Sequence, residues 1–269
     1  GRDIIHMEVG QPGTPAPSGA IRELTKKMNS EPLGYTVALG IPELRKKISS
    51  LYKEWYGLDI NPDRVIVTSG SSGAFILAFT ALFDTSDKVG IGAPGYPSYK
   101  QILRALDIEP VIIETFIENY FQFSPKFINN HDFIGILLSS PANPTGSMLD
   151  SNQLTQLIKK CHDNSISFIS DEIYHGIEYQ KKAVSALEIT DDCYVINSFS
   201  KYFSMTGWRV GWMVVPEAHI RQVERLAQNM FICAPHSSQI AALGALNSVK
   251  ELNQNLEVYK INRELLING

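Results

Sequence analysis

The sequence predicts an α/β fold with a mixed, mostly parallel central sheet and helices on both of its faces. Seven short runs rich in β-branched residues recur along the chain, and several are almost entirely apolar, as strands covered on both faces are. Segments with apolar residues at helical spacing lie between many of these runs. This alternation is typical of a mostly parallel sheet with right-handed connections.

The predicted elements follow one another from residue 64 onward. The strands are expected at residues 64–68, 88–92, 109–113, 133–138, 166–170, 193–197 and 209–215. The clearest helices are expected at residues 73–83, 96–106 and 150–162, with Asp150 or Ser151 as the N-terminal cap of the third. Residues 236–266 have helical character and form either two helices or one long helix.

The composition is that of a soluble globular protein with a large core, with 44% apolar and 19% charged residues. The formal net charge of −4 argues against nucleic-acid binding, and no apolar run has the roughly 18 residues of a membrane span. Cys161, Cys193 and Cys233 are odd in number and share no short spacing, so we expect neither a disulfide framework nor a zinc site. No signal-peptide pattern is present, and we expect a cytoplasmic protein.

Lys201 lies in the most informative segment, residues 198–209, which reads Ser-Phe-Ser-Lys-Tyr-Phe-Ser-Met-Thr-Gly-Trp-Arg. A lysine that forms an imine with an aldehyde cofactor needs hydroxyls and a fixed cation nearby to hold a phosphate. Ser198 and Arg209 flank the lysine, and a guanidinium is a permanently charged, forked phosphate partner. A solvated surface lysine is the alternative, but it fits poorly because apolar residues precede and follow this one.

Asp171 directly follows the predicted strand 166–170 and should face the crevice where open α/β sheets bind ligands. A carboxylate beside a pyridine nitrogen keeps that nitrogen protonated and makes the ring a better electron sink. Tyr174 could donate a hydrogen bond to an oxygen of the same ring. For Asp171 alone, a helix cap or a surface salt bridge is the alternative. Glu172 and His175 have metal-ligand spacing, but without a second histidine nearby we expect no metal site.

Two further turns are candidates for cofactor contacts. Residues 67–74 run from an apolar strand into a Gly/Ser turn and a helix, whose unpaired N–H groups can hold a phosphate, although an ordinary capped turn is the alternative. Asn143 lies between two prolines after the strand 133–138. These prolines would direct its amide toward a phenolate oxygen, whereas the alternative is an Asx turn.

The segment 90–95 matches the dinucleotide-binding pattern G-x-G-x-x-G, and Glu114 lies 19 residues after its last glycine. Pro94 and Pro97 count against this interpretation, because they rigidify the turn and remove N–H groups that would face a pyrophosphate. The aromatic residues Tyr96 and Tyr99 are more informative, since a ring at a strand end could stack on a planar cofactor.

In combination, these segments resemble the class I and II aminotransferases, which are pyridoxal-phosphate enzymes of fold type I. The resemblance rests on Asn-Pro-Thr-Gly at 143–146, Asp-Glu-Ile-Tyr at 171–174 and Ser-Phe-Ser-Lys at 198–201 with Gly-Trp-Arg-Val-Gly at 207–211, in this order. It covers nearly the whole chain and implies a three-layer α/β/α domain around a seven-stranded sheet. It also implies an enzyme that transfers an amino group between an L-amino acid and a 2-oxo acid.

The resemblance implies a role for each candidate residue. Lys201 would hold pyridoxal 5'-phosphate as an aldimine and then act as general base and acid, and Asp171 would pair with the pyridinium nitrogen. The phenolic oxygen would bind Tyr174 and Asn143, the ring would stack on Tyr96, and the phosphate would bind Ser71, Ser72, Ser198 and Arg209. Gly10 and Asn143 would contact the substrate. Tyr35 is similar to the tyrosine that reaches the phosphate of the neighbouring subunit, which implies a homodimer.

The same resemblance predicts how the chain is divided. Residues 1–40, rich in proline, glycine and small residues, would form a loop and a helix near the active site or a dimer interface. Residues 41–245 would form the cofactor-binding domain, and residues 246–269 would begin a helix that leads to a small C-terminal domain. The family's carboxylate-binding arginine lies in that small domain, so we expect these 269 residues to lack it.

Two other functions remain open at this point. A β-lyase or synthase uses the same cofactor and the same electron-sink residues. A regulatory module would bind the cofactor without turnover. The side chain of the amino-acid substrate is not determined, because specificity pockets lie in variable loops.

Overall fold

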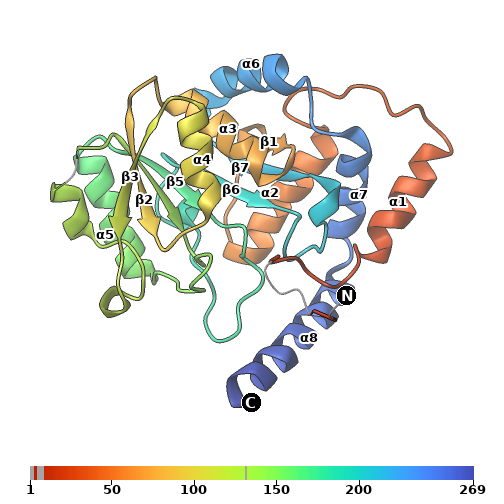
Figure 1. The fold of residues 1–269 in the computed structure, drawn as a ribbon. Coiled ribbons are helices and arrows are strands. Elements are labelled where there is room, and N and C mark those ends of the chain that lie inside the picture. Colours follow the sequence, from red (N-terminus) through yellow and green to blue (C-terminus); the bar gives the residue numbers. More distant parts are fainter. Residues whose placement is uncertain (1–2, 5–8, 131) are drawn as a thin grey trace.

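A computed structural model describes residues 3–4, 9–130 and 132–269 of the chain, and Figure 1 shows its fold. One sheet of seven strands forms the centre, in the order β1-β7-β6-β5-β4-β2-β3. Its strands are β1 (Val65–Thr68), β2 (Lys88–Ala93), β3 (Glu109–Glu114), β4 (Gly135–Ser139), β5 (Ser167–Asp171), β6 (Tyr194–Ser198) and β7 (Gly211–Val214). Every predicted strand is confirmed, with boundaries that differ by one or two residues.

The sheet is mixed and mostly parallel, as predicted. β7 lies between β1 and β6 and runs antiparallel to both. The pairs β6–β5, β5–β4, β4–β2 and β2–β3 are all parallel. The carboxyl ends of β4, β5 and β6 therefore meet at one edge of the sheet, which is where ligands bind in open α/β folds.

Helices cover both faces of the sheet, so that alternate strand residues enter two separate apolar cores. Ile66 packs in the core of α3 (Gly70–Leu82), α4 (Pro97–Ala105) and α6 (Ile220–Phe231). Its neighbours Val65 and Val67 pack in the core of α2 (Pro42–Tyr56), α5 (Ser151–Asp163) and α7 (His236–Leu246). This burial on both faces explains why the strands are nearly continuous apolar runs.

The helix predictions are confirmed for α3, α4 and α5. The side chain of Asp150 accepts a hydrogen bond from the Gln153 N–H (2.8 Å), and Gln153 returns one, which forms a capping box at the start of α5. Residues 236–266 form two helices, α7 and α8 (Val249–Asn268). The sequence analysis expected a helix within residues 1–40 without giving its bounds, and α1 (Ser18–Met28) lies there. It did not predict α2 or α6. None of these three helices begins with a side-chain cap.

The N-terminal segment is held against the C-terminal helices (Figure 1). α1 crosses α7 at two glycines, and a Cβ atom at Gly244 would lie 2.1 Å from the Gly19 carbonyl oxygen. The Glu251 carboxylate of α8 accepts hydrogen bonds from the N–H and the hydroxyl of Ser18 (2.7–3.0 Å). Thr14 is hydrogen-bonded to Tyr259 of α8 (2.6 Å). These contacts position the segment that carries Gly10.

Three further features of the described residues concern membrane-spanning helices, disulfides and metal-binding groups. None of the helices in the described part of the chain is both long and apolar enough to cross a membrane. The three cysteines are free thiols. Within residues 3–4, 9–130 and 132–269, no group of three or more His, Cys, Asp or Glu side chains could hold a metal ion.

Candidate active site

The candidate residues meet at the carboxyl ends of three adjacent parallel strands. Asn143 lies in the turn that follows β4, Asp171 is the last residue of β5, and Lys201 lies three residues after the end of β6. The strand order therefore brings together motifs that lie up to 58 residues apart in the sequence (201 − 143).

The Lys201 amine lies between the N-terminal segment and the Asp171–Tyr174 motif. Its Nζ donates a hydrogen bond to the Gly10 carbonyl oxygen (2.5 Å) and lies 5.7 Å from the centre of the Tyr174 ring. Partial burial lowers the pKa of Lys201, and the nearby Arg209 charge lowers it further, whereas Asp171 opposes both. A lowered pKa increases the fraction of neutral amine, which is the nucleophilic form.

Asp171 is a buried carboxylate with 3% of its surface exposed. One of its oxygens accepts a hydrogen bond from the Tyr99 hydroxyl, and the other accepts one from the Ile173 N–H (3.1 Å). Burial raises the pKa of Asp171 to about 6, against the opposing effect of these hydrogen bonds. A cationic partner within the site would favour the ionised form of this carboxylate.

Two tyrosines lie at the start of α4, and Tyr99 contacts this carboxylate directly. Tyr96 precedes the helix, and its ring meets the Tyr99 ring nearly edge-on, with centroids 5.4 Å apart. Tyr96 is 39% exposed, so one part of the ring is accessible to a ligand. Sequence reasoning noted both rings but not the hydrogen bond from Tyr99 to Asp171, because nothing in the sequence shows that the start of α4 lies against the end of β5.

The Gly/Ser turn and Arg209 form a second group of polar residues. Ser71 and Ser72 lie in the first turn of α3, whose N-terminus has no side-chain cap. A Cβ atom at Gly70 would lie 2.5 Å from Nη2 of Arg209, so the guanidinium lies directly against this turn. A cation beside uncapped helix N–H groups is a suitable environment for a phosphate.

Ser198 lies near the Gly/Ser turn and Arg209. It is the last residue of β6 and pairs with Gly211 of β7. Its hydroxyl donates to the Ser200 hydroxyl (2.8 Å) and approaches the Val210 carbonyl oxygen (3.2 Å). Ser200 is thus a further hydroxyl of this group that the sequence analysis did not select. Its position two residues after Ser198 was the available signal.

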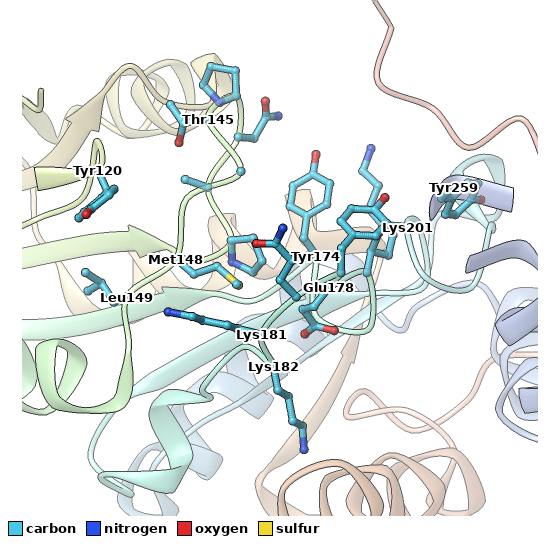
Figure 2. A pocket seen from close by; sticks show the side chains of 18 of the residues that line it. Tyr120, Thr145, Met148, Leu149, Tyr174, Glu178, Lys181, Lys182, Lys201 and Tyr259 are labelled. Atoms are coloured by element: carbon cyan, nitrogen blue, oxygen red, sulfur yellow. The ribbon is translucent and has the colours of Figure 1, made fainter. Parts of the chain in front are cut away.

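A cavity of about 1120 Å³ opens beside Lys201. Gly10, Asn143, Tyr174 and Lys201 all line it, together with Tyr259 and Arg263 of α8. Figure 2 shows the side chains of Tyr174 and Lys201 side by side and pointing in the same direction. Lys181 extends toward Met148 and Leu149 in another part of the cavity, on the side of Tyr120.

Tyr35 lies apart from the other candidate residues. It is 83% exposed and lines a separate surface hollow with Ser69 and His236. Its expected contact is with a neighbouring subunit, so its position in a single chain does not test the prediction.

Two alternative interpretations of the sequence do not fit the structure. Gly90 and Gly92 of the G-x-G-x-x-G match lie inside β2, and a Cβ atom at Gly90 would meet the side chains of Ile113 and Phe133 at 3.1 and 3.3 Å. These glycines serve packing against the neighbouring strand and loop and do not form a phosphate-binding turn. The second is a metal site at Glu172 and His175. Both side chains are buried, and their polar atoms are already hydrogen-bonded to other protein groups.

Comparison with known proteins identifies the family. The family model "Aminotransferase class I and II" matches residues 2–269. The valine–pyruvate aminotransferase of Mycobacterium tuberculosis is 41% identical over 273 residues, which cover 99% of this chain and 70% of that protein.

Solved structures agree with this assignment. A candidate aminotransferase from Silicibacter pomeroyi is 61% identical with a TM-score of 0.93, and the match covers 99% of this chain and 70% of the other. The aspartate aminotransferase of Thermotoga maritima is 30% identical with a TM-score of 0.94, covering 99% and 72%.

The chain belongs to the class I and II aminotransferases. Its sheet order, its three layers and its predicted site motifs all lie in the part of the fold that these relatives share. The reaction of this family is amino-group transfer, and the comparisons support this activity over the lyase and regulatory alternatives.

Proposed function

We propose that this aminotransferase binds pyridoxal 5'-phosphate between Lys201 and Asp171 and uses it to exchange the amino group of an L-amino acid with a 2-oxo acid. The observation that carries the proposal is the position of a half-buried amine beside a buried carboxylate at adjacent strand ends. Within this proposal, the phosphate is bound by Arg209 and by Ser71, Ser72 and Ser198, and the ring lies against Tyr96, with Asn143 and Tyr174 at its phenolic oxygen.

The residues present fit such a ligand in charge and shape. Gly70 has a φ of +71° and no side chain, which leaves Arg209 free to lie against the turn. When bound, the cofactor supplies an electrophilic carbon for the substrate amine and a ring that withdraws electrons. Asp171 would stabilise a positive charge on the ring nitrogen, because a nearby anion favours the protonated form of a base. Lys201 accepts and returns a proton at its Nζ.

The proposal includes a homodimer in which Tyr35 reaches the phosphate site of the partner subunit. Its support is the 83% exposure of Tyr35 in a stretch that also exposes Val37. Gly10 and Asn143 would contact the substrate, and both line the cavity beside Lys201. We place the protein in the cytoplasm within this proposal, since a reducing compartment maintains free thiols such as the three present here.

Replacement of the lysine tests the proposal. Lys201→Ala should abolish both the visible absorbance of bound pyridoxal phosphate and amino transfer from every donor in an amino-acid panel. Lys181→Ala is the matched control, because Lys181 lines the same cavity but is exposed and has no contact with Asp171 or Tyr174 among the interactions described here. Full activity in Lys201→Ala would disprove the proposal. Release of pyruvate without oxo-acid exchange would favour the lyase.

A further inference from the structure

His175 is a buried histidine next to the active-site motif that the proposed reaction does not use. It directly follows Tyr174 and is 1% exposed. Its Nε2 lies 2.9 Å from the Ser140 carbonyl oxygen, and its Nδ1 lies 2.5 Å from the Tyr56 hydroxyl. Ser140 begins the turn that carries Asn143. The histidine therefore connects α2, the Asp171–Tyr174 motif and the Asn143 turn.

The chemistry of these contacts fixes the proton on one nitrogen. Burial lowers the pKa of His175 to about 4, so the ring is neutral at physiological pH. A carbonyl oxygen only accepts, so Nε2 must carry the proton and donate it to Ser140. Nδ1 then has a lone pair, and the Tyr56 hydroxyl donates to it. Tyr56 thus selects the tautomer that binds the turn.

Glu172 does not compete for this proton. Its Oε2 lies 3.6 Å from Nδ1, which is beyond hydrogen-bond distance. Its two carboxylate oxygens accept instead from the Ser170 and Ser185 hydroxyls and from the Ala186 N–H (2.8–3.0 Å). The tautomer therefore depends on Tyr56 and Ser140 alone among the contacts of the ring described here.

Ser140 transmits this contact to the turn. Its N–H donates to the Asp171 carbonyl oxygen (3.3 Å), and its hydroxyl accepts from the Leu149 N–H (3.1 Å). Within the turn, the Ala142 N–H donates to the Ser147 carbonyl oxygen (3.0 Å). Asn143 thus lies in a loop whose two ends are joined through Ser140. Gln122 holds the far side by donating to the Ser147 carbonyl oxygen (2.8 Å).

We infer that His175 is a positioning residue, held in its tautomer by Tyr56, that fixes the Ser140 turn and thereby aims the Asn143 amide into the cofactor site. This inference rests on the proposed function for what Asn143 contacts. The link itself, from Tyr56 through His175 to the turn, is independent of any ligand. Because Gln122 also holds the turn, loss of His175 loosens the turn without detaching it.

The first experiment measures the turn without the cofactor. Amide hydrogen exchange of residues 140–149 should accelerate in His175→Phe and in Tyr56→Phe. Tyr194→Phe is the matched control, because Tyr194 makes the same kind of hydrogen bond to Nδ1 of His219 (2.9 Å) at the opposite end of β6. His175→Gln retains a donor at the position of Nε2 and should restore slow exchange. Equal exchange in Tyr56→Phe, His175→Phe and Tyr194→Phe would overturn the inference.

The second experiment measures the effect on Asn143. His175→Phe should weaken pyridoxal phosphate binding by about tenfold, the loss expected for one hydrogen bond to a buried group. The same substitution should have little effect in an Asn143→Ala background, because the two residues act through one contact. If His175→Phe weakens pyridoxal phosphate binding by the same factor whether or not Asn143 is present, the inference is contradicted.

The outcomes also separate the two proposals. Unmodified protein that binds no pyridoxal phosphate would reject the proposed function, while the exchange measurement would still test the link. If His175→Phe does not fold, Tyr56→Phe serves in both experiments, since it removes only a hydroxyl.

Discussion

Asp171→Asn should stabilise the cofactor-free protein while it destroys the enzyme. The pKa of Asp171 rises from its ordinary value of 3.8 to about 6 because the carboxylate is buried. Ionising this group at neutral pH therefore costs the folded state free energy that the unfolded state does not lose. Asparagine has nearly the same shape, can still accept from the Ile173 N–H, and never ionises.

The magnitude follows from the difference in pKa. Each pKa unit corresponds to about 1.4 kcal/mol, so a rise of about 2 units corresponds to roughly 3 kcal/mol above pH 7. The sign follows from proton binding. Between pH 4 and 6 the folded state holds a proton that the unfolded state has lost, so stability falls as pH rises through this window. The advantage of asparagine should thus shrink to about half near pH 5 and nearly vanish below pH 4.

Urea unfolding of both cofactor-free proteins between pH 4 and pH 8 measures this difference. Glu172, whose pKa burial raises to about 7, titrates in both proteins, so the comparison removes its own burial cost and retains only its repulsion with Asp171, which contributes to the raised pKa of Asp171. Asp192→Asn, at an exposed position, controls for the chemical change itself. In the same variant, amino transfer should fall by on the order of 100-fold or more, because the anion that stabilises the ring charge is gone. An Asp171→Asn protein that is no more stable at pH 8, or whose advantage does not depend on pH, would refute the reasoning.

Three further outcomes are expected. Gly70→Ala should reduce pyridoxal phosphate affinity and lower the free energy of unfolding by about 1–3 kcal/mol, because the new Cβ would collide with Arg209 and the residue has a φ of +71°. Cofactor titration measures the affinity, and calorimetry measures the stability. An unchanged affinity would contradict the assignment of this turn to the phosphate. Asp150→Ala should cost about 1 kcal/mol in chemical denaturation by removing the α5 cap, whereas a cost near zero would show that Gln153 or water replaces it. Burial raises the pKa of Cys161 to about 12, so in the native state this thiol should react with a thiol reagent far more slowly than the half-buried Cys233. The absorbance of the group that the reagent releases measures both rates. Equal rates would mean that the core around Cys161 opens readily.

The strands were predictable because burial on both faces imposes a simple local pattern. Ile66 and its neighbours are apolar whichever way they point, so the run is visible without knowledge of the partner strands. α2 was harder to predict, because it begins at Pro42 after the apolar Ile41 and lacks a Ser, Thr, Asp or Asn cap. Its glycine terminator, Gly57 at a φ of +76°, was a signal that sequence reasoning left unused.

The candidate site was predictable where chemistry follows local sequence. Asp171 could be placed because a strand end is a local property, and Lys201 because its neighbours are chemically distinctive. The contacts of Tyr99 and His175 could not be predicted, because each depends on which strand lies beside which. The order β6-β5-β4-β2 brings α4 to Asp171 and the Ser140 turn to His175, and no pairwise spacing in the chain encodes that order.

The N-terminal segment joins the C-terminal helix α8 to the surroundings of the Lys201 amine. Thr14 touches both Tyr259 of α8 and Ser204, three residues beyond the lysine, while Gly10 accepts the hydrogen bond from the amine itself. Gly10 lies four residues before Thr14, so a short stretch of chain links α8 to the amine. A change in the inclination of α8, whose far end projects away from the body of the molecule (Figure 1), would therefore be expected to shift the carbonyl oxygen that holds the amine.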